Sequence, residues 1–146
     1  MKLDRYEINA SAEFLIFEFI STGPKVDISK IIQFELVGAQ ELYNLAFGDK
    51  RPGSDEIDDL ITDNGDSEKI LATVVSALYS FSEHYPAAWV YATGSTKSRT
   101  RLYRMGINKY IEFVNADFEL FGQISGGWEL FKEGRDYEAF IVKRKN

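Results

Sequence analysis

The sequence predicts one α+β domain over residues 1–146, in which a mixed, mostly antiparallel sheet is packed by two main helices in the order βββ-α-β-α-ββ(β). The length is that of a single domain, and no internal repeat, linker or low-complexity tract divides it. Hydrophobic residues make up 45% of the chain and aromatic residues 14%, which is enough to build a packed core. Segments rich in Phe and Ile surround two segments with helical spacing, so strands are expected on either side of a central helical part.

The first third of the chain has the pattern of three strands. Residues 12–21 (AEFLIFEFIS) are mostly apolar and end at the turn signal TGP. Residues 30–38 alternate, with Ile32, Phe34 and Leu36 on one face. Residues 41–49 (ELYNLAFGD) are the third candidate, and the short turns between the three predict an antiparallel meander.

An acidic loop, residues 50–66, separates these strands from the first helix. It contains six acidic residues, two Gly and one Pro. Apolar residues at helical spacing then predict a helix over residues 67–84. Asp66 or Ser67 can cap its start, and Tyr85-Pro86 ends it.

The rest of the chain predicts a strand, a second helix and the last strands. Residues 87–94 (AAWVYATG) are a short apolar run that indicates a buried strand. The basic segment after it predicts a helix from about Thr96, kinked at Gly106. Residues 118–125 and, after a Gly-Gly hairpin signal, residues 128–134 and 135–145 have strand patterns. The side chains of the second helix expected to face the core are Leu102, Met105, Ile111 and Val114.

The residue counts exclude several classes of site. There is no Cys, which excludes disulfides, thiolate metal sites and cysteine nucleophiles. The single His, His84, stands at a predicted helix end, where a helix-terminal or partly buried role is expected. The acidic loop does not match a calcium-binding loop, so no metal site is predicted. The net charge of −6 argues against general nucleic-acid binding, and the charged N-terminus and short apolar runs predict a cytoplasmic protein without membrane contact.

The basic segment predicts an anion-binding site. A strand that ends near Gly94 and leads into a helix presents the backbone N–H groups of Ser95 and Thr96 and the positive end of the helix dipole. Arg99 and Arg101 can neutralise an anion held there, so a phosphate-bearing small molecule is the expected ligand. The cations that share one helix face by their i, i+4, i+7 spacing are Lys97, Arg101 and Arg104.

Two alternatives account for the same charges. The acidic residues between 49 and 68 can pair with the basic segment within the chain, with Asp49, Asp55 and Asp59 competing for its cations. An acidic protein partner can also take those cations. The sequence names no cofactor, and it leaves open whether the chain is an enzyme or a ligand-binding or protein-interaction module.

The phrases YNLAFGD, DNGD, GSTKSRTRLYRMGI and YEAFIVKRK resemble those of a family of small, uncharacterised bacterial proteins, over nearly the whole chain. This resemblance implies no activity. It implies that YNLAFGD and GSTKSRTRLY lie close in space, so that Asn44 and Asp49 approach Ser95, Arg99 and Arg101.

The element order is also similar, more distantly, to the latter part of N-acetyltransferases of the GNAT superfamily. In those enzymes a strand is followed by a helix that carries a Leu-Tyr pair and then Gly-Phe, and Leu102-Tyr103 and Gly106-Ile107 occupy similar places here. The resemblance implies that Tyr103 protonates a departing coenzyme A thiolate. The chain departs from the family's pattern where the preceding helix opens with Asp66 and Glu68 instead of a Gly-rich pyrophosphate loop.

Overall fold

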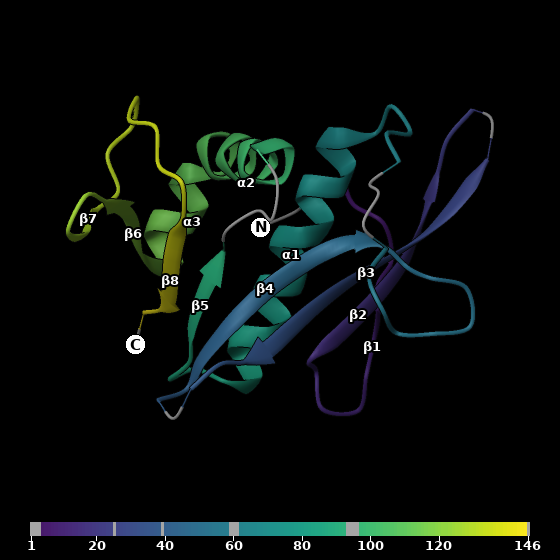
Figure 1. The fold of residues 1–146 in the computed structure, drawn as a ribbon, viewed down its shortest axis with the longest axis horizontal. Helices are drawn as coiled ribbons and strands as arrows, with labels where there is room; N and C mark the ends of the chain where they lie inside the picture. Colours follow the sequence, from purple (N-terminus) through teal and green to yellow (C-terminus); the bar gives the residue numbers. More distant parts are fainter. Residues whose placement is uncertain (1–3, 25, 39, 59–61, 93–96, 146) are drawn as a thin grey trace.

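The described residues form an eight-stranded sheet (Figure 1). The computed structural model describes residues 4–24, 26–38, 40–58, 62–92 and 97–145, without the side chains of residues 97–100, 102 and 103. All neighbouring strands are antiparallel except β4 and β5, which confirms the predicted α+β class with its mixed, mostly antiparallel sheet. In spatial order the strands are β1 (Asn9–Ala10), β2 (Ile16–Thr22), β3 (Asp27–Leu36), β4 (Leu42–Asp49), β5 (Trp89–Ala92), β8 (Phe140–Arg144), β6 (Phe118–Ile124) and β7 (Gly127–Leu130).

The chain builds this sheet in two halves. Strands β1 to β4 follow one another as the predicted meander, and β5 then pairs parallel to β4 after the helix α1 (Ser67–His84). The last strand, β8, lies between β5 and β6 and is antiparallel to both. The hairpin of β6 and β7 turns at the Gly-Gly pair, as predicted. Strand β7 is shorter than expected, and residues 131–139 connect it to β8.

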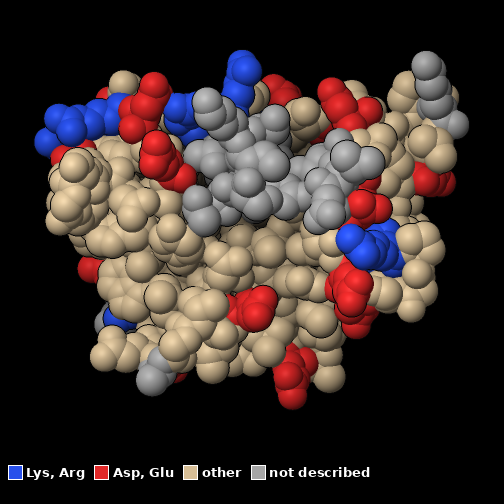
Figure 2. Space-filling view, viewed as in Figure 1, with Lys and Arg blue, Asp and Glu red and all other residues tan. Residues whose placement is uncertain are grey.

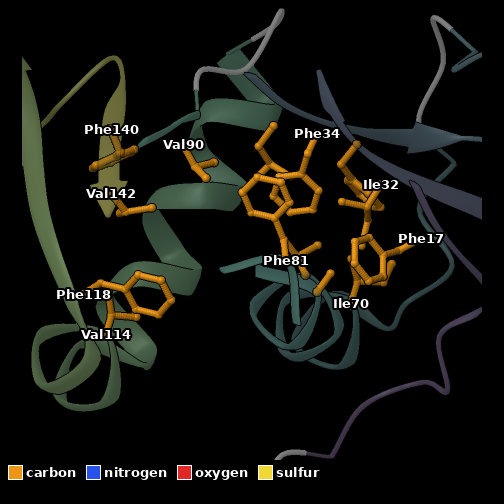
Figure 3. Close-up of a cluster of buried hydrophobic side chains, with 14 of the residues drawn as sticks. Phe17, Ile32, Phe34, Ile70, Phe81, Val90, Val114, Phe118, Phe140 and Val142 are labelled. Atoms are coloured by element: carbon orange, nitrogen blue, oxygen red, sulfur yellow. The ribbon is translucent and has the colours of Figure 1, made fainter. Parts of the chain in front are cut away.

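The helices cover one face of the sheet, and the core lies between them and the strands (Figure 1). Besides α1 they are α2 (Lys97–Lys109) and α3 (Ile111–Asp117). Figure 3 shows side chains of α1 against the meander, where the rings of Phe34 and Phe81 stack 4.2 Å apart, and Val114 of α3 beside Phe118 and Val142. Within the described ranges, no helix has the length and apolar character needed to cross a membrane.

The second helical segment differs from its prediction. It divides at Tyr110, the residue before α3, and not at Gly106. Gly106 is buried against α1, where an added Cβ would lie 2.9 Å from Leu71 Cδ2. This close approach brings Gly106 and Ile107 to the core side, so Met105, which was expected in the core, is exposed. Leu36, expected on the inner face of its strand, is also exposed because it lies at the end of β3, whereas Val114 is buried as predicted.

Helix α1 begins and ends at the predicted residues. Asp66 is its N-cap residue, but its side chain makes no capping hydrogen bond. The carboxylate instead accepts hydrogen bonds from the hydroxyls of Tyr6 and Ser21, each at 2.5 Å. Asp66 therefore attaches the start of α1 to β2 and to the segment before β1.

We predict that Gly122→Ala lowers the free energy of unfolding by about 1–3 kcal/mol, the usual cost of overpacking a core site. An added Cβ would lie 2.3 Å from the ring of buried Tyr137, whose hydroxyl is fixed by a 2.7 Å hydrogen bond to Glu129. Gly106→Ala is the matched comparison and should cost less, because its Cβ meets the movable end of Leu71 and Ala favours the helix. Urea denaturation measures both variants, and an equal loss in the two would contradict the packing argument.

Candidate functional site

Strands β4 and β5 are the one parallel pair among the described residues, and the anion site was expected at the carboxyl ends of these strands. Its register joins Leu42 to Trp89 and Asn44 to Tyr91. Beyond Asn44, β4 continues to Asp49 along β3, whereas β5 ends at Ala92 and α2 begins at Lys97. The carboxyl ends of both strands and the start of α2 are therefore at the same end of the sheet.

Much of the predicted anion site falls outside the described part of the chain. Gly94, Ser95 and Thr96 lie outside the described residues. Lys97 and Arg99 belong to the first turn of α2 and Tyr103 to its middle, but their side chains are not described. Of the predicted ligand-binding cations, Arg101 and Arg104 have described side chains, and Arg101 is exposed.

The described side chains of helix α2 make two ion pairs within the chain. Arg104 Nη1 lies 2.6 Å from Asp136 Oδ1, in the connection between β7 and β8. Lys109 Nζ lies 2.9 Å from Glu68 Oε2, and this hydrogen bond raises the pKa of Lys109. One of these two partners, Glu68 in the first turn of α1, belongs to the acidic residues between 49 and 68 that were expected to pair with the basic segment. Because Asp136 and Glu68 are largely exposed, neither pair contributes much to stability.

Asp49 lies in a different environment from the one predicted. Its carboxylate pairs with Lys30, whose side chain is fully buried, and accepts hydrogen bonds from the backbone N–H and the hydroxyl of Thr62 at 3.0 and 2.7 Å. Lys30 also donates to the carbonyl of Thr62 at 2.9 Å. Asp49 thus attaches the acidic loop to the sheet through Thr62 and Lys30.

Sequence reasoning missed Lys30. Its burial could have been found from strand alternation, because Lys30 stands two and four residues before Ile32 and Phe34 and therefore faces the core with them. A buried ammonium group requires a carboxylate partner, and Asp49 is its register partner on β4. Asn44 lies on the same strand as Asp49 but faces the other side of the sheet, and its register partner on β5 is Tyr91.

The rest of the acidic loop also has structural contacts. Asn64 Nδ2 donates to Ser21 Oγ and to the carbonyl of Val26, both at 3.1 Å, and the carbonyl of Asp55 accepts a hydrogen bond from Gln33. Asp59 lies outside the described residues. In the described ranges no three acidic or His side chains are grouped in a way that could hold a metal ion. The described parts of the loop are therefore attached to β2 and β3 through Asn64 and Asp55.

His84 has the helix-terminal role expected of it. It is the last residue of α1, its Nδ1 lies 2.9 Å from the carbonyl of Ser80, and its ring stacks on Phe14 with centroids 3.6 Å apart. Phe14 has a φ of 58°, so this stacking accompanies a left-handed backbone conformation at the turn before β2. These contacts give His84 a packing role at the end of α1.

We predict that Asp49→Ala lowers the free energy of unfolding by about 3–5 kcal/mol, because it leaves the buried Lys30 ammonium without its carboxylate. Adding Lys30→Met should recover part of this loss, since the double variant buries no unpaired charge. Asp55→Ala, an exposed position in the same loop, is the control and should change stability by less than about 0.5 kcal/mol. Urea denaturation compares the three, and equal effects of Asp49→Ala and Asp55→Ala would remove the proposed role of the pair.

Comparison with known proteins places the chain in a family without giving it an activity. The comparison found no matching curated protein and no matching solved structure. One family model matches residues 2–145, which is almost the whole sequence and supports the resemblance inferred from the sequence phrases. The chain belongs to DUF6934, a family of unknown function.

Proposed function

We propose that this protein is a ligand-binding module that holds an anion at the end of the sheet where β4 and β5 finish and α2 begins. The observation that supports the proposal is the parallel pairing of β4 and β5, joined by α1 and followed by the start of α2. In open sheets with parallel strands, ligands bind outside the carboxyl ends of those strands. The N–H groups of the first helical turn have no partners within the helix, and the dipole adds positive potential there.

The charges of α2 favour a phosphate-bearing ligand. Its first turn contains two basic residues and no acidic residue, and exposed Arg101 follows one residue after that turn. Lys97, Arg101 and Arg104 are spaced i, i+4, i+7, so these three positions share one face of α2. Arg104 already has a partner, but Asp136 is 91% exposed, so a multiply charged anion can compete with it.

The first test is thermal denaturation with inorganic phosphate, ATP and coenzyme A at low ionic strength. A ligand at a hundred times its Kd adds about 2.7 kcal/mol of stability, which for this chain length is a rise in Tm of roughly 5–10 °C. We expect Arg101→Ala to remove most of that rise, and Arg51→Ala, an exposed Arg in the acidic loop, to leave it unchanged. Both variants remove one positive charge, so net charge alone cannot explain a difference.

Two outcomes would reject this assignment. One is the absence of a shift with any of the three anions. The other is an equal shift in the wild-type chain and in Arg101→Ala. If the small anions have no effect but an acidic protein is retained with strong salt dependence, the partner is a protein and the ligand proposal fails.

A second candidate function is acyl transfer, through a divergent relationship with GNAT enzymes. The observation that favours it is the crossover β4–α1–β5 followed by α2, which carries Leu102-Tyr103 and Gly106. In such a reaction the nitrogen of an amine forms a bond to the thioester carbonyl carbon and the carbon–sulfur bond breaks. Tyr103 donates its hydroxyl proton to the departing thiolate, and the proton that the amine loses returns to the Tyr103 oxygen through solvent. The start of α1 offers no pyrophosphate site, because Asp66 is held there by Tyr6 and Ser21.

For acyl transfer we predict that Tyr103→Phe lowers kcat for transfer from acetyl-coenzyme A by about 10²–10⁴-fold, the usual contribution of a general acid. Coenzyme A affinity should be unchanged, because the ring is kept. Tyr110→Phe, just beyond α2, is the matched control and should leave kcat unchanged. Isothermal titration and release of free thiol measure binding and turnover, and no binding at millimolar coenzyme A would eliminate this candidate.

A further inference from the structure

The face of the sheet opposite the helices contains an apolar groove of about 670 Å³. Strand alternation explains its lining, because Val90, Phe140 and Leu120 point to the core and their neighbours therefore point outward. The outward neighbours that line the groove are Trp89, Ile141 and Phe121, together with Leu42, Trp128 and Val37. The hollow lies at the amino ends of β4 and β5, at the opposite end of these strands from the proposed anion site.

This part of the surface is almost uncharged although the chain has a net charge of −6. On β5, β6, β7 and β8, the outward positions carry two charged residues among those described, Glu119 and Lys143, and these are register partners of opposite sign. Lys143 Nζ also lies 5.6 Å from the ring centroid of Trp89. Figure 2 shows the same face in space-filling form, with uncharged residues over most of its centre and lower left. A charged ligand or an acidic partner would therefore find little to pair with here.

Strand β7 adds exposed apolar side chains in the groove and beside it. Leu130, on the edge strand β7, is 66% exposed, and Trp128 is 39% exposed. The ring of Trp128 makes an edge-to-face contact with the ring of Tyr91, with 5.8 Å between centroids and 82° between planes. Exposed apolar surface of this kind on a folded domain is typical of an interaction site.

We propose that this surface, the groove together with Leu130 beside it, binds a second copy of the same chain in a two-fold symmetric dimer. Such an interface uses the same patch on both subunits, so the patch must contain both a hollow and a matching projection. Here the groove, which Trp128 helps to line, is the hollow, and Leu130, the exposed register partner of Phe121, is the projection. The absence of net charge on the patch favours such a contact, because a patch with a net charge would meet the same net charge on its copy and be repelled.

The acidic loop does not prevent this approach. Its backbone contacts Gln33 on β3, in the other half of the sheet, and Lys50 pairs with Glu18 on β2 at 3.6 Å. The excess negative charge is therefore displaced from the groove. Dimerisation would cover the two Trp residues of the chain, Trp89 and Trp128, which both line the groove.

The test is sedimentation velocity of the full chain together with its tryptophan emission over a dilution series. We expect a dimer whose emission shifts to longer wavelength as it dissociates. Leu130→Asp should raise the dimer dissociation constant by about tenfold or more, since it places a charge in the apolar contact. Ile20→Asp, at a 54% exposed strand position on β2, is the matched control and should not change it.

A second measurement keeps the proposal testable if Leu130→Asp does not fold. The chain has no Cys, so single thiols can be placed at Leu130 in one sample and at Val37 in another. A short bis-maleimide should join the mixed samples Leu130→Cys and Val37→Cys, and should not join Leu130→Cys with Ile20→Cys. A wild-type chain that sediments as a monomer at high micromolar concentration would overturn the proposal, as would cross-linking that is equal for both mixtures. A monomer that binds a different protein through this face would overturn it as well.

Discussion

The parallel contact between β4 and β5 is the constraint on which the rest of this fold depends. Because Trp89 pairs with Leu42, the first residue of β4, the chain must return along the whole of that strand before β5 can begin. The eight residues of β4 span about 26 Å. The 18 residues of α1 span about 27 Å, so the helix covers the return distance, and the acidic loop leads the chain from the end of β4 to its start. The apolar side of α1 then covers the meander, and the opposite face of the sheet receives no helix.

The corner that begins α1 combines several weak contacts with one strong requirement. The hydrogen bonds of Asn64 to β2 contribute modestly, as those of a neutral amide do, and the carboxylate of Asp66 adds a hydrogen bond from Ser21. Lys30 is different, because an ammonium group that is fully removed from water must keep its carboxylate. The Lys30–Asp49 pair, together with Thr62, therefore fixes where the acidic loop rejoins the sheet.

The sequence predicted the features that depend on neighbouring residues. It did not predict those that depend on contacts between segments far apart in the chain. The bounds of α1 followed from apolar spacing and flanking residues, and the meander followed from short turns between strand-like segments. The insertion of β8 between β5 and β6 was not predicted, because register between distant strands leaves no local periodicity. Gly106 was interpreted as a kink, but its lack of a side chain serves the contact between α1 and α2. Trp89 and Phe121 were unassigned, since alternation shows which residues share a face and not which face is open.

The one-sided arrangement of the helices gives the molecule two separate surfaces. The carboxyl end of the β4–β5 pair carries the basic helix α2, whereas the amino end of the same pair lies under the uncharged groove. About three residues of pairing separate the two along the strands, and the groove faces away from the helices. Neither Arg101 nor any other residue of α2 lines the groove. Charged and uncharged recognition can then occur on the same small domain without competition, since salt screens the first and scarcely affects the second.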